Sequence, residues 1–376
     1  MRKPLENILV VDFSQALAGP YCTLLMADNG ARIIKIERPG SGDMLRDAEP
    51  MNSKKESLFF ASGNRGKESI ALDLTLDDNK DFIWKIIEKA DILVENFRPG
   101  VMKKLGFSYE EVKKINPAII YTSISGFGQT GPMSHEPGFD LVGQGYSGIM
   151  SVNGEASQDS ERIGIVIGDI SAGMWGYMAT MTALYAKEKT GNGAHVDISM
   201  LDSLFAILPP QVANYMNEGI ISTPSGNCDP VGAPFGVVPV KDGQIIVAIL
   251  GNKLWGEYCK VIGKPDLEED KCFYSNELRV KNRTELRKIT RPIMKTKTVD
   301  EWIKLLKSAG IPCGIVNNIK DACNMKQIKS RNMLCRAGKY TLAGNPMKIS
   351  GYEDPYEKGS IPDLGEHTEK ILKEFT

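Results

Sequence analysis

The sequence predicts a mixed α/β fold, in which a doubly wound parallel sheet carries an inserted smaller α/β domain. Short apolar segments rich in Ile and Val alternate with segments of helical period along the first 200 residues. The chain has 376 residues, of which 42% are hydrophobic, so it can bury the core of one large domain or of two.

The first βαβ unit opens the predicted sheet. Residues 7–13 (NILVVDF) form a continuous apolar run, which is typical of a parallel strand buried on both faces. Pro20 then begins a helix, where its missing N–H costs nothing, and Asn29-Gly30 ends it. Further strands are predicted at residues 31–37, 69–74, 91–97 and 118–128, with a helix at 78–90.

The composition and the predicted elements change in the second half of the chain. We predict a helix over 171–187, a strand over 195–200 and another helix from about Leu201. Beyond residue 215 the chain becomes rich in Pro and Gly, a hairpin follows over 236–250, and Lys-rich helical segments occupy 253–308. We therefore predict a large domain over residues 1–214 and a smaller α/β domain with its linkers at 215–325.

Composition excludes several classes of protein. The 46 basic and 47 acidic residues nearly balance, so nucleic acid is not an expected partner. No signal peptide is visible, and the apolar run after Asp169 is rich in small residues, so we expect no membrane span. Seven scattered cysteines without a CxxC pair indicate unpaired thiols in a reducing, cytoplasmic compartment. Three histidines without ligand spacing predict no metal site.

Asp169 is the only charged residue in the stretch from Gly164 to Ala186. Asp before an apolar run is a favoured helix N-cap, because its oxygen accepts an orphan backbone N–H. A carboxylate in a dry setting is also a candidate nucleophile or base. The two interpretations are compatible, and at this point both stay open.

Two features of the sequence concern a nucleotide ligand. Residues 143–148 (GQGYSG) match the pattern GxGxxG, but this pattern should follow the first strand and here lies far downstream, so we do not expect NAD. Basic residues recur near the predicted strand ends, either as solvated surface or as a cradle for a polyphosphate. They are Arg38, Lys67, Arg98, Lys103 and Lys104.

Several segments together resemble one family. They include residues 12–43 (DFSQALAGPYCTLLMADNGARIIKIERPGSGD), 95–107 (ENFRPGVMKKLGF), 138–150 (GFDLVGQGYSGIM) and 168–173 (GDISAG). In this order they are similar to the family III CoA-transferases, the CaiB/BaiF group. The resemblance implies a Rossmann-like large domain built from both chain ends, here residues 1–214 and 326–376, with the smaller domain inserted at 215–325. It also implies an interlocked homodimer.

The resemblance also implies a mechanism. The Asp of the segment GDISAG is the family's nucleophile, which places that role on Asp169. The substrates are then an acyl-CoA thioester and a small carboxylic acid, and the intermediates are an aspartyl anhydride and an aspartyl-CoA thioester. The segment GFD implies that Asp140 is a supporting acid close to the nucleophile.

The resemblance further implies how CoA is held. Arg38 and Lys104 match contacts to the phosphates, and Leu72, Asn96 and Phe97 match the adenosine pocket. The complete expected CoA-binding set is Arg38, Leu72, Asn96, Phe97, Arg98, Lys104 and Phe139.

Departures from the family pattern bear on the substrate. Oxalate-using members have Gln in the loop where this chain has Leu17, with Gln15 two residues earlier, and a glycine run where this chain has only Gly251. Both departures argue against oxalate and formyl-CoA.

Other functions stay open. Similar racemases of 2-methylacyl-CoA use a His where this chain has Phe139, which cannot move a proton. A non-catalytic CoA-binding protein is expected to lack the nucleophile, and a dehydrogenase is expected to have a glycine fingerprint after its first strand.

Overall fold

The computed structural model describes residues 3–155 and 158–376. The chain divides into two compact units. Unit 1 comprises Met1–Met150, Arg162–Ile221 and Met325–Thr376, and unit 2 comprises Ser151–Glu161 and Ser222–Asn324. The segment Ser151–Glu161 therefore belongs to unit 2, although the sequence pattern places it in the large domain.

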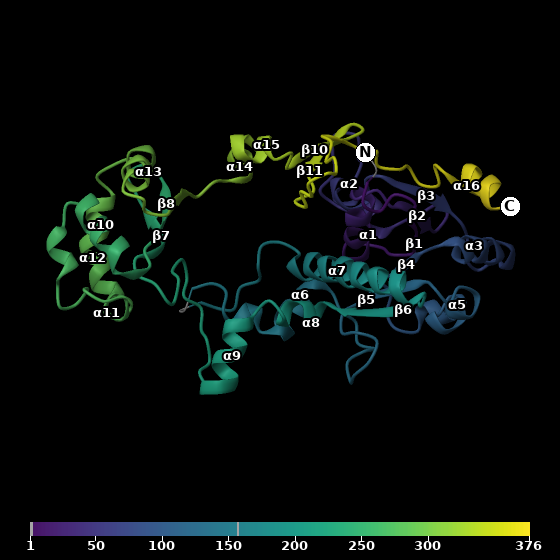
Figure 1. The fold of residues 1–376 in the computed structure, drawn as a ribbon, viewed down its shortest axis with the longest axis horizontal. Helices are drawn as coiled ribbons and strands as arrows, with labels where there is room; N and C mark the ends of the chain where they lie inside the picture. Colours follow the sequence, from purple (N-terminus) through teal and green to yellow (C-terminus); the bar gives the residue numbers. More distant parts are fainter. Residues whose placement is uncertain (1–2, 156–157) are drawn as a thin grey trace. The chain divides into compact units, whose positions relative to one another are not determined.

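Unit 1 is built on a six-stranded parallel sheet in the order β3-β2-β1-β4-β5-β6 (Figure 1). This is a doubly wound order, with a switch point between β1 and β4. The predicted parallel sheet is confirmed. The strands are β1 (Leu9–Asp12), β2 (Arg32–Glu37), β3 (Lys67–Ala71), β4 (Ile92–Glu95), β5 (Ile120–Ser125) and β6 (Ala194–Ser199).

Helices cover both faces of this sheet. Successive residues of a strand point to opposite faces, so Val10 and Val11 of β1 belong to two different apolar clusters. The Val10 side contacts α1 (Ala18–Asp28) and α7 (Ile167–Thr190). The Val11 side contacts α3 (Asp77–Lys89), α5 (Tyr109–Ile115) and α16 (Thr368–Phe375).

The small residues of α7 allow this helix to lie very close to its neighbours. A Cβ on Gly173 would lie 2.7 Å from the Ala18 carbonyl oxygen, and one on Gly176 would lie 2.8 Å from Ile124 Cδ1. One face of α7 therefore packs in the core of unit 1, whereas Met174, Trp175, Met178 and Tyr185 of the same helix are exposed. Among the residues that the structure describes, no helix has both the length and the apolar character needed to cross a membrane.

The remaining elements of unit 1 connect or flank this framework. A three-stranded sheet has the order β11-β10-β12. The elements are α2 (Leu58–Asn64), α4 (Val101–Leu105), α6 (Asp140–Ser147), α8 (Met200–Phe205), α9 (Pro209–Glu218), α15 (Lys326–Ser330), β10 (Leu334–Ala337), β11 (Tyr340–Ala343), β12 (Glu357–Lys358) and the 3-10 turns Met44–Asp47 and Ile149–Ser151.

Unit 2 has its own antiparallel sheet and its own core. The predicted hairpin is confirmed as β7 (Phe235–Pro239) paired with β8 (Gln244–Ala248), and β9 (Cys313–Ile315) completes the sheet. Trp255 and Trp302 are fully buried in the core. The helices are α10 (Gly251–Val261), α11 (Asn276–Lys281), α12 (Arg283–Met294), α13 (Val299–Ser308) and α14 (Ile319–Asn324), with a 3-10 turn at Pro265–Glu268.

Candidate active site

The start of α7 differs from the sequence prediction. The helix begins at Ile167, so Asp169 is its third residue, and no side chain of α7 caps its own N-terminus. The predicted N-cap role of Asp169 is therefore wrong. Asp140 of α6 supplies the cap instead, because its Oδ1 accepts the Gly168 N–H at 2.6 Å. The prediction failed because the capping group lies 28 residues away in the sequence.

Asp140 is itself held on its second oxygen. Gln144, one turn along α6, donates from Nε2 to Asp140 Oδ2 at 2.7 Å, and its Oε1 accepts the Ile163 N–H at 2.9 Å. A Cβ on Gly168 would lie 2.9 Å from Asp140 Oδ1, so only glycine permits this approach without a shift. Gln144 thus joins α6 to the segment that leads into α7, a role that the sequence analysis did not identify.

Asp169 stands without a counter-charge. It is half-buried, and among the described residues no cation pairs with its carboxylate and no hydrogen bond to its side chain is present. Burial, and then the negative charge of Asp140, raise the pKa of Asp169 to about 7. A carboxylate that is neither paired nor fully solvated is available to react with a ligand.

The loop after β1 is fixed by a side chain from the end of β4. Asn96 accepts the Gln15 N–H at 2.8 Å and donates to the Gln15 carbonyl oxygen at 2.7 Å. The next residue, Ala16, has a φ of 59°, and its N–H donates to Asp43 Oδ1 at 3.0 Å. Asn96 therefore positions this loop, and its amide group is committed to the Gln15 backbone.

A buried ionic network lies beneath the same loop. Asp12 at the end of β1 accepts hydrogen bonds from Thr23 at 2.7 Å and from Lys67 at 3.1 Å. Lys35 donates to the Ser14 carbonyl oxygen at 2.6 Å and pairs with Asp43. Lys67 is fully buried, so it belongs neither to the solvated surface nor to a phosphate cradle, and both interpretations of this residue are wrong. The place of Lys67 in the strand is compatible with a buried side chain or with an exposed one. The sequence pattern alone does not distinguish these two positions.

The other expected CoA-binding residues come from several elements. Arg38 follows β2, Leu72 follows β3, and Phe97 and Arg98 follow β4. The carboxyl ends of parallel strands lie at one edge of the sheet, where ligands of doubly wound folds bind. Arg38, Arg98 and Lys104 are exposed and Phe97 is half-buried, whereas Leu72 is buried in the core.

Phe139 immediately precedes Asp140 and is 65% exposed. The residues Gly143 to Gly148 lie mostly within α6, so their GxGxxG pattern does not form a strand-to-helix turn. No group of three or more His, Cys, Asp or Glu side chains in the described part of the chain has the arrangement of a metal site.

Comparison with known proteins decides the family. Residues 5–368 match the family model described as CoA-transferase family III. The chain belongs to this family. It is 40% identical to an acetyl-CoA:oxalate CoA-transferase of Acetobacter aceti, over 99% of this chain and 96% of that protein. It is 34% identical to a succinyl-CoA:glutarate CoA-transferase of Mus musculus, over 99% and 86% of the respective chains.

The solved structures agree with this assignment. A CAIB/BAIF family protein from Brucella suis matches this family III CoA-transferase with a TM-score of 0.91 at 32% identity, and 100% of both chains is covered. The resemblance seen in the motifs is therefore confirmed, and so is the mixed α/β fold with its large parallel sheet.

The contacts of Gln144 lead to a first prediction. We expect Gln144→Leu to lower kcat by about 10- to 100-fold, because small displacements of a reacting group have effects of this size. The loss of hydrogen bonds to Asp140 and Ile163 releases the start of α7, which carries Asp169. Steady-state kinetics measure this effect, and CoA binding and the melting temperature report the fold.

Gln327→Leu is the matched control, since Gln327 is exposed on α15. Its kinetic constants are expected to stay within about two-fold of the wild type. Equal kcat values in Gln144→Leu and in this control would contradict the positioning role.

Proposed function

We propose that this enzyme transfers CoA from a short acyl-CoA to a short dicarboxylic acid, with Asp169 as the covalent nucleophile. The observation that carries the proposal is the unpaired, half-buried carboxylate of Asp169 in the first turn of α7, whose pKa is raised to about 7. Above pH 7 this carboxylate is anionic and poorly solvated, which favours attack on an electrophile.

The proposed steps conserve every atom. An Asp169 oxygen attacks the thioester carbonyl carbon and the C–S bond breaks. This step releases CoA thiolate and forms an acyl–aspartyl anhydride. The thiolate then attacks the aspartyl carbonyl carbon, which releases the donor acid and leaves an aspartyl-CoA thioester. The acceptor carboxylate attacks the aspartyl carbonyl carbon, the C–S bond breaks, and CoA thiolate is expelled as a second anhydride forms. The thiolate then attacks the acceptor carbonyl carbon of this anhydride, which gives the CoA thioester of the acceptor and frees the Asp169 carboxylate. Exclusion of water protects the anhydrides from hydrolysis.

The substrate class rests on the relatives. The names of the two relatives include oxalate, succinyl-CoA and glutarate, which are dicarboxylic acids or their thioester. The 40% identity with an oxalate-using relative weighs against the exclusion of oxalate that Leu17 and Gly251 suggest. Oxalate, succinate and glutarate are therefore the acceptors to test, with acetyl-CoA and succinyl-CoA as donors.

The proposal also covers CoA binding and assembly. Arg38, Arg98 and Lys104 are the exposed cations proposed to contact the CoA phosphates. Phe97 and Phe139 are proposed to supply apolar surface for the adenosine and the acyl chain, and Asn96 holds the loop after β1. Leu72 is buried in the core and offers little surface to a ligand. Family resemblance supports an interlocked homodimer as the active assembly.

Covalent trapping tests the mechanism. The enzyme is incubated with each acyl-CoA, reduced with borohydride and examined by intact and peptide mass spectrometry. Borohydride converts an aspartyl-CoA thioester to an alcohol, so we expect a mass loss at Asp169 in the wild type. Asp169→Asn is expected to show none. Trapping on another residue, or transfer by a folded Asp169→Asn protein at the wild-type rate, would refute the covalent role.

A further inference from the structure

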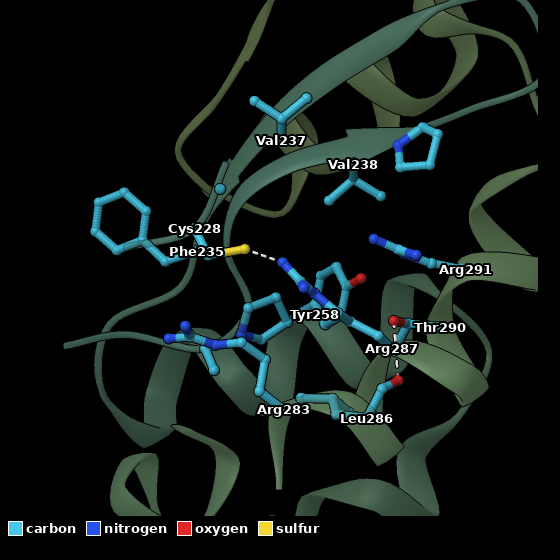
Figure 2. Close-up of a pocket in the computed structure, with 14 residues that line it drawn as sticks. Cys228, Phe235, Val237, Val238, Tyr258, Arg283, Leu286, Arg287, Thr290 and Arg291 are labelled. Carbon is cyan, nitrogen blue, oxygen red and sulfur yellow. Dashed lines mark hydrogen bonds between the residues drawn. The ribbon is translucent and has the colours of Figure 1, made fainter. Parts of the chain in front are cut away.

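A small cavity of unit 2 lies between β7 and α12 (Figure 2). Its free volume is about 40 Å³, which holds a few water molecules but is far below the size of a small-molecule site. This cavity therefore has too little room for an organic ligand. A buried carboxyl group of unit 1, by contrast, lies directly next to residues proposed to bind CoA.

Glu95 is the last residue of β4, and three residues assigned above to CoA binding or to its support follow it at once. They are Asn96, Phe97 and Arg98. Glu95 is 4% exposed, and its Oε2 accepts the Phe97 N–H at 2.8 Å. The Phe97 ring packs against the apolar cluster that contains Val11. One carboxyl oxygen of Glu95 thus fixes the backbone of the segment 96–98 at the end of the strand.

Glu95 is buried without a counter-charge. Among the residues that the structure describes, no Lys, Arg or His forms an ion pair with its carboxyl group. Its side chain also hydrogen-bonds to Ser123, which lies directly opposite on β5 and whose Oγ lies 3.0 Å from His195 Nε2. Burial raises the pKa of Glu95 to about 7, and the charge of Asp197 acts in the same direction, whereas the hydrogen bonds from Ser123 and Phe97 oppose both.

The titratable groups around Glu95 and Ser123 come from the neighbouring strands and helices. Burial raises the pKa of Tyr121 and lowers that of His195, so both side chains are neutral near pH 7. On the other side of β4, strand β1 presents apolar residues of the Val11 cluster. The groups are Tyr121 of β5, His195 and Asp197 of β6, Tyr109, Glu110 and Glu111 of α5, and Lys103 of α4, which acts on Glu111.

The protonation state of Glu95 sets the direction of these hydrogen bonds, because the Ser123 hydroxyl has a single proton to donate. When Glu95 is ionised, Ser123 donates to it and accepts from His195 Nε2. When Glu95 is protonated, its carboxyl group donates to Ser123, which then donates to His195. The bond from the Phe97 N–H loses its charge at the same time, and charge-assisted hydrogen bonds are roughly twice as strong as neutral ones.

We propose that Glu95 is a positioning residue for CoA binding: as a carboxylate it holds the Phe97 backbone, and its protonation loosens the segment 96–98 and weakens the binding of CoA. The inference rests on the proposed function, in which Phe97 and Arg98 contact CoA. A neutral side chain could accept the same N–H without the cost of burying a charge, so the stability of the fold alone does not require a carboxyl group at this position.

Calorimetric titration with CoA at pH 5.5 and pH 8.5 tests the proposal in the full-length enzyme. Asp169→Asn is compared with Asp169→Asn combined with Glu95→Gln, so that the titration of Asp169 does not contribute. We expect the Glu95→Gln protein to bind CoA about five-fold more weakly at pH 8.5 and equally well at pH 5.5. Both proteins bind the same ligand, so the titration of the CoA phosphates cancels in the ratio of their Kd values.

The amide proton of Phe97 reports the hydrogen bond directly in NMR spectra of protein labelled with ¹⁵N-phenylalanine. Its signal, assigned with Phe97→Leu, is expected to move downfield as the pH rises, with a midpoint near 7, and to stay fixed in Glu95→Gln. Asp197→Asn is expected to lower this midpoint, because it removes a repulsive charge. Ser123→Ala is expected to raise it, because it removes a hydrogen bond to the carboxylate.

Glu88→Gln is the matched control, since Glu88 is exposed on α3 of the same unit, and its ratio of Kd values is expected to stay near one at both pH values. A ratio for Glu95→Gln that is the same at pH 5.5 and pH 8.5, or a Phe97 amide signal without a step near pH 7, would overturn the positioning role while CoA binding itself persists. Absence of CoA binding at both pH values in the protein that retains Glu95 would instead refute the proposed function, and this inference with it.

Discussion

Replacing Asp169 with asparagine is expected to abolish CoA transfer and, above pH 7, to stabilise the folded protein. Asparagine keeps the shape of the side chain but is a far weaker nucleophile, so we expect turnover to fall by about ten-thousand-fold. The gain in stability follows from the environment of the carboxylate, because burial and the charge of Asp140 disfavour its ionised form.

The raised pKa of Asp169 sets the direction of the pH dependence of stability. The pKa of Asp169 rises from 3.8 to about 7 on folding, so between these values the folded chain binds more protons than the unfolded chain. The free energy of unfolding therefore decreases as the pH rises through this range, and the full cost applies above pH 7. One pK unit corresponds to about 1.4 kcal/mol, and partial exposure reduces the total to about 2 kcal/mol. Asp169→Asn removes this cost.

Urea unfolding at pH 4 and pH 8 measures the effect. The variant and the wild type are expected to have equal stability at pH 4 and to differ by about 2 kcal/mol at pH 8. The wild-type kcat/KM is expected to rise with pH, with a midpoint near 7. Glu188→Gln, on an exposed position about 28 Å along α7, is the control. A pH-independent difference between Asp169→Asn and the wild type would contradict this account.

Local patterns in the sequence are sufficient to predict the large sheet. The strands β1 and β4 are short apolar runs, β2 has three isoleucines, and α1 has Pro20 in its first turn and ends at Asn29-Gly30. The boundaries are less well predicted. β3 ends at Ala71, three residues earlier than expected, and Asp73 then accepts the N–H of Thr75 in a turn. That turn competes with the strand for the same residues.

The candidate site shows the same contrast between local and distant contacts. Asp169 and Asp140 are recognisable because they lie in short motifs that resemble the family. The roles of Asn96 and Lys67 depend on partners 81 and 55 residues away in the sequence. Asn96 could be selected as a site residue from its motif, but its bond to the Gln15 backbone has no local signal. The sequence around Lys67 is equally compatible with an exposed side chain and with a buried one.

Lys67→Met is expected to destabilise the protein by about 3 to 5 kcal/mol, the largest stability effect of any substitution considered. Lys67 donates to Asp12 at 3.1 Å, to the Pro20 carbonyl oxygen at 3.0 Å and to Asn64 at 2.9 Å, and its side chain is fully buried. Burial raises the pKa of Asp12, but the charges of Lys67 and Lys35 outweigh this effect and lower it to about 2. Methionine fills the same space but leaves the charge of Asp12 with one fewer cation.

The loss is expected to spread to the loop after β1, because Asp12 also accepts the N–H of Ser14 at 2.9 Å. Hydrogen exchange is expected to accelerate at residues 14–19, and urea unfolding gives the change in free energy. Lys80→Met is the matched control, since within the described part of the chain Lys80 pairs only with Asp77, whose side chain is 92% exposed, and we expect a change below about 0.5 kcal/mol. Asp12→Asn combined with Lys67→Met is expected to recover about 1 to 2 kcal/mol, because it removes the buried charge that has lost its ion-pair partner. Equal stability of Lys67→Met and Lys80→Met would show that the buried network does not hold the loop.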